Sequence, residues 1–412
     1  MRPAFHFTAE RGWINDPHGI TVRDGTYHAF YQYVPDSTVW APGCHWGHAT
    51  GPDLLSLAPL PVAIAPGDGD DGIWTGSLVT GDDGEARIFY TSTTLPDLGI
   101  GRIRVATPRD DDWVSWEKGA VVVDAPADLD LVAFRDPFVV RDPDAWRMFV
   151  GAGAADGTAM ALSYRSDDLD TWSYEGVALQ RSKGVRDLVW LGALWECPQV
   201  IAIEGVHAMV SSVWDADVLH YAGYALGSYA TGRFDARTWG RLTYGPSYYA
   251  PSFFRDTDGR PCVLFWMRGV EDIGAGWAGA HSVPYVLGVD GDRLTAAPHP
   301  DLERYRADPV VDGVVPGLAA DVEWSASEGA TLVVTSAGQP VVELRAGEGL
   351  LEARAGAQAW QMPFDGGDVR VVLDAQVVEI SCASGVLGLT GAPAGDSLHV
   401  LAADATVHPL AR

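Results

Sequence analysis

Two short apolar runs joined by a polar turn occur five times in about the first two thirds of the chain. The copies begin at Asp16, Gly76, Asp136, Glu196 and Pro251, a spacing close to sixty residues. The runs are rich in β-branched and aromatic residues, and Asp-Gly pairs recur in the turns. Such a pattern is typical of β-hairpins. A chain with this repeat can adopt only a few all-β architectures.

The second half of each period is long enough for two more strands, separated by polar turns such as the one expected at Phe234–Trp239. Four strands per copy and five copies predict a five-bladed β-propeller. From Leu318 onward, short alternating runs rich in Gly, Ala and Val suggest a small β-sandwich. We therefore predict an all-β fold, with a propeller over residues 1–300, a proline-bearing linker over 301–317 and a C-terminal β-sandwich over 318–412.

Composition excludes several classes of function. The net charge is −27, from 55 acidic and 28 basic residues, which disfavours binding to nucleic acid or to an anionic membrane. The four cysteines are scattered without CxxC spacing, so reduced thiols are expected rather than a disulfide framework. The N-terminal residues have no apolar signal region and no segment reaches transmembrane length. We expect a cytoplasmic protein, and its oligomeric state is left open.

Three of the five copies begin with a carboxylate: Asp16, Asp136 and Glu196. Equivalent positions on successive blades would bring them together at the mouth of the central channel. Retaining glycoside hydrolysis needs an ionised nucleophile and a protonated acid. The apolar neighbours of Glu196 would raise its pKa, whereas Arg135 would keep the pKa of Asp136 low. The residues alone favour Glu196 as the acid/base and do not decide which aspartate attacks.

Two groups of residues could suggest a metal site. Cys44, His45 and His48 lie close together in the sequence, but packing within a strand is the simpler interpretation. Asp68, Asp70 and Asp71 lack the full ligand set of a calcium loop, so a solvated acidic loop is expected. We predict neither a metal nor an organic cofactor.

Around the three carboxylates the sequence resembles glycoside hydrolase family 32, the invertases, levanases and inulinases. Trp13–Gly19 (WINDPHG) resembles the family's WMNDPNG signature, Arg135–Pro137 its RDP motif and Glu196–Cys197 its EC motif. The Tyr31–Tyr33, His45–His48 and Trp74–Ser77 stretches also match in order and spacing. The resemblance covers the whole chain and implies a five-bladed propeller followed by a β-sandwich.

The resemblance also implies individual roles. Asp16 would be the nucleophile, Glu196 the acid/base, and Asp136 would bind sugar hydroxyls and stabilise the oxocarbenium-like transition state. A terminal fructose would be bound by Asn15, Gln32, Trp40, Trp74, Thr75, Arg135 and Trp266. No cofactor would be needed, because two carboxylates suffice for the chemistry.

Three positions depart from the family pattern. His18 stands where the family usually has Asn, Ser252 replaces a Gln, and Thr243 stands where an aspartate of the substrate cleft is often found. These departures leave the handling of the leaving-group sugar in question.

The prediction is a retaining β-fructofuranosidase that hydrolyses terminal fructose from sucrose, fructo-oligosaccharides or fructan fragments, so its partner would be a small carbohydrate. A second hypothesis is a fructosyltransferase, including an enzyme that forms or cleaves difructose anhydrides. A third is a different class of propeller glycosidase, such as an arabinofuranosidase or xylosidase. A fourth is a non-catalytic sugar-binding propeller.

Overall fold

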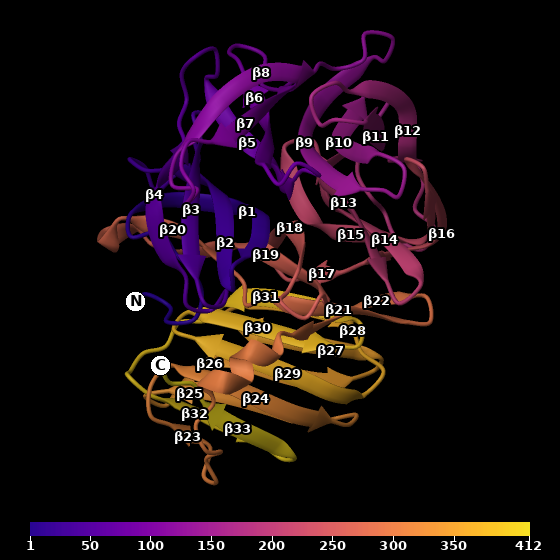
Figure 1. Ribbon diagram of the computed structural model, residues 1–412. Helices are drawn as coiled ribbons and strands as arrows, with labels where there is room; N and C mark the ends of the chain where they lie inside the picture. Colours follow the sequence, from indigo (N-terminus) through magenta and orange to yellow (C-terminus); the bar gives the residue numbers. More distant parts are fainter.

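The computed structural model describes residues 1–412 and consists almost entirely of β-strands. Antiparallel sheets form a ring of five blades, and a β-sandwich packs beside the ring (Figure 1). The all-β propeller and sandwich predicted from the repeat are therefore confirmed. No helix is long and apolar enough to cross a membrane.

The first three blades follow one another along the chain. Blade 1 consists of β1 (Gly12–Arg23), β2 (Thr26–Val34), β3 (His45–Gly51) and β4 (Ala58–Ile64). Blade 2 consists of β5 (Gly72–Thr80), β6 (Ala86–Thr93), β7 (Arg102–Pro108) and β8 (Trp116–Val123). Blade 3 consists of β9 (Leu131–Arg141), β10 (Trp146–Ala154), β11 (Thr158–Ser166) and β12 (Ser173–Ser182).

The last two blades complete the ring. Blade 4 consists of β13 (Leu194–Ile203), β14 (Val206–Asp215), β15 (Val218–Ala230) and β16 (Arg233–Arg241). Blade 5 consists of β18 (Tyr248–Arg255), β19 (Pro261–Asp272), β21 (Tyr285–Asp290) and β22 (Arg293–Pro298). The turn expected at Phe234–Trp239 was wrong: these residues lie in β16, where Phe234 is buried between exposed neighbours, as in an edge strand.

Hairpin turns and a closing strand hold the ring together. Asp24 and Gly25 both have positive φ, as do Glu204 and Gly205, which is the geometry that two-residue hairpins require. After the short helix η1 (Ile273–Ala275), strand β20 (Trp277–His281) pairs with β19 and, in parallel, with β1. Blades 1 and 5 therefore form one continuous nine-stranded sheet, which closes the propeller.

The innermost strands are β1, β5, β9, β13 and β18, and each contacts the next around the central axis. Each carries a β-bulge at the same level, where its register against the neighbouring strand shifts by one residue. Bulges re-aim side chains and tolerate proline, which cannot donate to the ladder. The predicted site residues lie at or directly beside these bulges, except Trp40, which lies in the loop after β2.

The C-terminal domain is a sandwich of two six-stranded sheets around its own apolar core. One sheet contains β17 (Thr243–Tyr244), β24 (Ala319–Ala326), β29 (Gly367–Asp374), β30 (Val377–Cys382), β31 (Gly385–Thr390) and β33 (Ala405–Pro409). The other contains β23 (Val314–Val315), β25 (Thr331–Ser336), β26 (Gln339–Gly347), β27 (Leu350–Ala355), β28 (Gln358–Pro363) and β32 (Leu398–Ala402).

The segment between the last blade and the sandwich is packed against both domains. It contains the short helix η2 (Pro300–Tyr305) and strand β23. The hydroxyl of Tyr305 donates to Asp53 in the propeller, and Arg306 pairs with Asp321 in the sandwich. The division of the chain at residues 300 and 317 stays a prediction, and the segment between these residues is structured.

A buried polar cluster joins the two domains. The ring of His6 contacts Asp374 at 2.8 Å and Glu379 at 3.2 Å, and both carboxylates belong to the sandwich. Tyr285 of blade 5 donates to Glu379 at 2.6 Å and also contacts Tyr248. Burial alone would lower the pKa of His6, but the two carboxylates outweigh it and raise the pKa to about 9. A protonated His6 therefore ties the N-terminal segment to the sandwich.

We expect His6→Ala to lower the free energy of unfolding by about 3 kcal/mol near pH 6, because two buried carboxylates lose their cation. The pKa of His6 is about 9 in the fold and about 6.5 in an unfolded chain. Its contribution is thus complete below the unfolded pKa and is lost as the pH rises through the folded pKa. Denaturant unfolding of both proteins over this range measures the difference. A difference that stays constant or grows with pH would contradict the role given to His6.

Candidate active site

The three predicted carboxylates line one cavity of about 620 Å³ at the end of the axis where the inner strands begin. Every predicted site residue except Thr75 lines this cavity, and Thr75 lies beside it, bonded to Asp16. The predicted side chains come from the inner strands of blades 1 to 4, from β2 and β19 beside them, and from the loop after β2. The fold thus brings the predicted site residues together, and the role of each one stays a prediction.

Asp16 accepts hydrogen bonds from three neutral side chains. Its carboxylate receives bonds from Thr75 Oγ1 at 2.7 Å, Asn15 Nδ2 at 3.0 Å and Gln32 Nε2 at 3.3 Å. Gln32 also contacts Thr75 and Asn15, and Trp13 donates to Asn15, so the donors hold one another in place. Burial raises the pKa of Asp16, whereas the bonds from Thr75 and Asn15 lower it. The donors stabilise the ionised carboxylate that a nucleophile needs.

Asp136 is buried within the bulge of β9, where its backbone has a positive φ of 63°. Its Oδ2 accepts a hydrogen bond from the backbone N–H of Cys197 at 3.0 Å. The sulfur of Cys197 is 3.7 Å from this oxygen and 3.9 Å from Oδ2 of Asp16. Cys197 therefore lies between the two aspartates and connects both to the strand that carries Glu196.

Glu196 is held between a phenol and a guanidinium. The hydroxyl of Tyr249 donates to its Oε2 at 2.6 Å, and Arg135 Nη1 lies 3.5 Å from its Oε1. Arg135 is itself fixed over the ring of Trp74. Burial raises the pKa of Glu196, while Arg135 and Tyr249 lower it. Burial leaves Glu196 suited to hold a proton, as expected of a general acid.

The expected low pKa of Asp136 was wrong. Burial and the charge of Glu196 raise its pKa well above the usual range, and Arg135 offsets this only in part. The reason is geometric, because Arg135 forms its ion pair with Glu196 rather than with its sequence neighbour.

The expectation that the three carboxylates occupy equivalent strand positions also needs a correction. In the strand register Glu196 corresponds to Arg135, each being the last paired residue before the bulge, and Cys197 falls within the bulge as Asp136 does. Asp16 is the second residue of its bulge, whereas Asp136 is the first, so the repeat spacing was in error by one residue between Asp16 and Asp136 and by one more between Asp136 and Glu196. Glu196 thus lies just before the bulge of its strand, where it accepts a hydrogen bond from Tyr249.

Sequence reasoning missed several residues that line the cavity. Trp13 lies within the recognised Trp13–Gly19 motif and Tyr249 lies three residues before Ser252, so their neighbours could have indicated them. The others belong to turns and strand ends that carry no repeated pattern: Leu98, Gly99, Val132, Trp214, Asp217 and Leu219. They form the outer part of the cavity, together with Trp40.

The three departures from the family pattern lie outside the cavity lining. His18 is buried below Asp16, with its ring 3.9 Å from that of Trp46, and burial holds its pKa well below the usual value. Ser252 is buried in β18. Thr243 pairs with the sandwich through β17 and accepts a bond from the N–H of Ala222. None of the three lines the cavity.

The residues that suggested metal sites have other partners. Cys44 donates to the carbonyl of Ala41, and His48 contacts His28. The solvated loop expected at Asp70 was wrong, because Asp70 is buried and pairs with Arg104 and Lys118.

One group of possible metal ligands converges in the structure, formed by Asp256, Cys262 and His299. Asp256 already accepts hydrogen bonds from Arg260 and His299. The guanidinium of Arg260 therefore supplies the positive charge that a metal ion would otherwise bring to this carboxylate.

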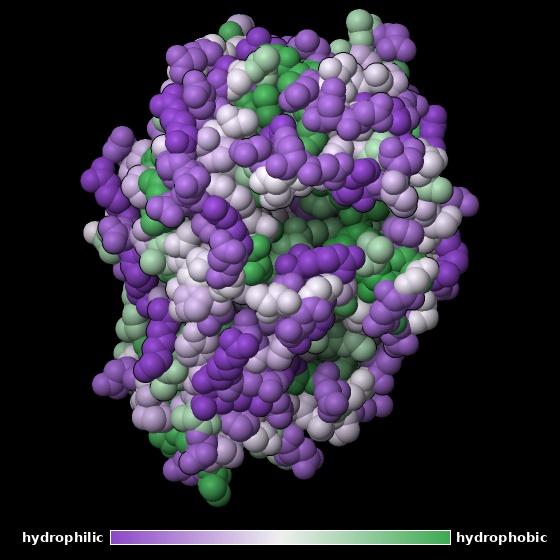
Figure 2. Space-filling model, viewed as in Figure 1, coloured by the Kyte–Doolittle hydropathy of each residue, from purple (hydrophilic) through white to green (hydrophobic).

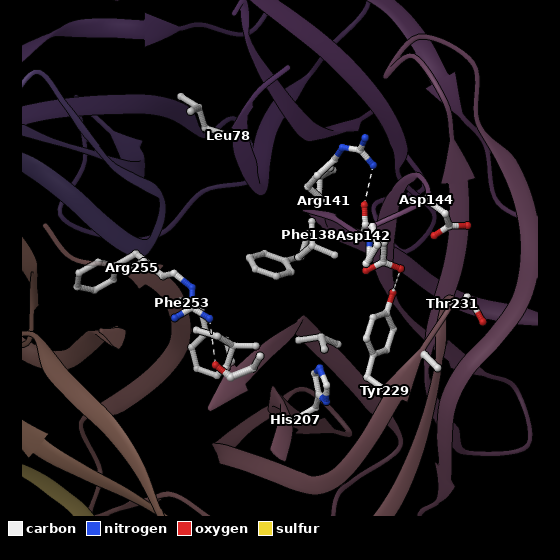
Figure 3. A pocket seen from close by; sticks show the side chains of 18 residues that line it. Leu78, Phe138, Arg141, Asp142, Asp144, His207, Tyr229, Thr231, Phe253 and Arg255 are labelled. Atoms are coloured by element: carbon white, nitrogen blue, oxygen red, sulfur yellow. Dashed lines mark hydrogen bonds between the residues drawn. The ribbon is translucent and has the colours of Figure 1, made fainter. Parts of the chain in front are cut away.

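A larger cavity, of about 990 Å³, lies at the opposite end of the inner strands (Figure 3). Its lining is mostly apolar, and the propeller face in Figure 2 shows an apolar hollow near its centre. Its charged groups are engaged within the protein: Asp142 accepts from Tyr229, and Arg255 donates to Ala202. It lacks a set of convergent carboxylates, so the smaller cavity is the candidate active site.

Asp136→Asn should raise the free energy of unfolding at neutral pH by about 1–2 kcal/mol, as removal of a strained functional group often does. Because the pKa of Asp136 is raised, folded stability falls as the pH rises above about 4 and this carboxyl is forced to ionise. Asparagine keeps an oxygen that can accept from Cys197. Thermal unfolding at neutral and acid pH measures the effect, with the exposed Asp36→Asn as control. A variant less stable than the wild type at neutral pH would contradict this account.

Comparison with known proteins agrees with this geometry. The sequence model of the glycosyl hydrolases family 32 N-terminal domain matches residues 6–298. A sucrose-6-phosphate hydrolase of Zymomonas mobilis is 30% identical over 347 residues, which are 76% of this chain and 65% of that protein. One from Escherichia coli is 36% identical over 219 residues, 51% of this chain and 43% of that protein. The matches thus span less than two thirds of these relatives.

Solved structures extend the likeness to the whole chain. The β-fructofuranosidase of Bombyx mori, solved as a mutant with sucrose, has a TM-score of 0.86 and 25% identity, covering 100% of this chain and 94% of that one. Fructan 1-exohydrolase IIa of Cichorium intybus, at 19% identity and a TM-score of 0.85, shares the fold over 99% of this chain and 97% of that one. With the family model matching most of its length, the chain belongs to glycosyl hydrolase family 32.

Proposed function

We propose that the protein is a retaining β-fructofuranosidase that releases terminal fructose from sucrose, fructo-oligosaccharides or fructan fragments. The observation that carries the proposal is the meeting of Asp16, Asp136 and Glu196 in one buried cavity with complementary donors. The names of the family relatives, which are sucrose-6-phosphate hydrolases and β-fructofuranosidases, support the same class of substrate.

In the first step Asp16 attacks the anomeric carbon of the terminal fructose, and Glu196 gives its proton to the glycosidic oxygen. The bond between that carbon and oxygen breaks, and the leaving sugar departs with the proton. The fructosyl unit is then held by an ester bond to Asp16. The three hydrogen bonds stabilise the ionised form of Asp16 before the attack. Because all three donors are neutral, no opposite charge is left unpaired when Asp16 becomes an ester.

In the second step Glu196, now a carboxylate, removes a proton from a water molecule that attacks the same carbon. The ester bond breaks, Asp16 regains its charge and free fructose leaves. Arg135 and Tyr249 stabilise the ionised Glu196 of this step. The opposing effects of burial and these two partners allow Glu196 to act as acid and then as base.

Asp136 does not form a bond to the sugar in this scheme. Its position between Cys197 and the cavity lets it bind ring hydroxyls and stabilise positive charge on the fructose ring. Trp74 and Trp266 supply apolar walls against which a furanose ring can lie.

Asp16→Asn and Glu196→Gln should each lower sucrose hydrolysis by about a thousandfold or more, because each removes a reacting group. Release of free fructose, measured with product separation, tests this. Asp142→Asn, in the cavity at the other end of the axis, is the matched control and should retain activity. Full activity in either of the first two variants would refute the assignment, and oligomeric products in place of fructose would refute hydrolysis.

Two further variants should move opposite limbs of the pH profile. Thr75→Val removes a hydrogen bond that lowers the pKa of Asp16, so the acid limb should shift to higher pH because the nucleophile must be ionised. Tyr249→Phe removes a bond that lowers the pKa of Glu196, so the alkaline limb should shift to higher pH because the acid must be protonated. The profile of kcat/KM measures both. A shift of both limbs by the same variant, or toward lower pH, would contradict these roles.

A further inference from the structure

The lining of the active-site cavity is mostly acidic among its charged residues. Besides the three catalytic carboxylates it contains one more, Asp217, and a single basic side chain, Arg135. Arg135 is already paired with Glu196. Asp217 is exposed and forms neither an ion pair nor a side-chain hydrogen bond. Its negative charge is therefore not neutralised within the protein and can attract or repel a substrate that enters the cavity.

The backbone of Asp217 has the conformation of a tight turn. It lies in the two-residue turn between β14 and β15, where Ala216 and Asp217 both have positive φ, at 50° and 61°. Asp and Asn tolerate this conformation better than most residues. The turn belongs to the same blade as Glu196, since β14 pairs with β13. Because Glu196 and Asp217 both line the cavity, we expect the leaving sugar, which receives its proton from Glu196, to depart past this turn.

The surroundings of Asp217 are apolar. Trp214 and Leu219 flank the turn, and Leu98, Val132 and Trp40 form the rest of the outer lining. The exposed fractions of Trp40 and Val132 are 42% and 54%. Such a surface offers apolar faces for a sugar ring to lie against, while the carboxylate can accept bonds from its hydroxyls.

Arg135 is the one lysine or arginine that lines the cavity. Arg268 donates to the backbone carbonyls of Leu219, His220 and Tyr248 and does not line the cavity. Lys183, which lies 3.8 Å from Asp215, and Arg186, which lies over the ring of Trp190, do not line the cavity either. The lining therefore presents no free cation to an incoming anion, and the net charge of −27 adds a general repulsion.

We propose, resting on the function proposed above, that Asp217 makes this enzyme select neutral leaving groups and reject phosphorylated ones. Sucrose 6-phosphate, named as the substrate of two of the relatives, carries its phosphate on the glucosyl unit that would leave past this turn. At neutral pH the phosphate has a charge of about −1.5 to −2. Like charges placed together disfavour the wrong partner, whereas the hydroxyl of unmodified glucose donates to the same carboxylate.

The test compares kcat/KM for sucrose and for sucrose 6-phosphate at neutral pH and low ionic strength. We expect the wild type to favour sucrose by about tenfold or more, as repulsion between a phosphate and a carboxylate implies. Asp217→Asn, which suits the same backbone conformation, should narrow that ratio by about threefold, in the range of exposed charge pairs. Added salt should narrow the wild-type ratio as well.

Asp404→Asn is the matched control, because it removes a turn carboxylate with a similar positive φ of 55° from the distant sandwich. It should leave the ratio unchanged. Equal cleavage of both sugars by the wild type, a preference for the phosphorylated one, or an unchanged ratio in Asp217→Asn would overturn the proposal. Cleavage of neither sugar would instead overturn the proposed function on which it rests.

Discussion

Three carboxylates are buried together in one cavity, and much of the surrounding structure offsets the resulting repulsion. Burial raises the pKa of Asp16, Asp136 and Glu196. Each has a different set of partners: neutral side-chain donors for Asp16, a backbone N–H for Asp136, and a phenol and a guanidinium for Glu196. Differences between these environments allow chemically similar groups to take different roles in one reaction.

The bulged inner strands explain how the fold supplies those partners. A regular strand would alternate its side chains between two faces, whereas the extra residue in each bulge re-aims them toward the axis. Asp136 and Cys197 adopt positive φ at their bulges, a conformation that is uncommon for residues other than glycine. The closed ring and the sandwich behind it hold this arrangement, with β20 joining the last blade to the first.

The repeat in the sequence predicted the propeller, and the motifs predicted which side chains would meet, because both are properties of local pattern. Two features could not be read in this way. The one-residue offset between Glu196 and Asp136 depends on the register of the strands. The ion pair between Arg135 and Glu196, formed in place of one with Asp136, depends on how blades 3 and 4 lie relative to each other. The outer residues Trp214 and Asp217 lie at the end of β14 and in the turn that follows it, where no pattern repeats, so only the folded chain places them at the cavity.

Direct capture of the covalent intermediate tests the central claim most sharply. Glu196→Gln, supplied with β-fructosyl fluoride, should form the intermediate because fluoride leaves without an acid, and should hydrolyse it slowly because the base is missing. Mass spectrometry after rapid acid quenching should find one fructosyl group, on the peptide that contains Asp16. A label on Asp136, or steady turnover of the fluoride by an Asp16→Asn variant, would contradict the account.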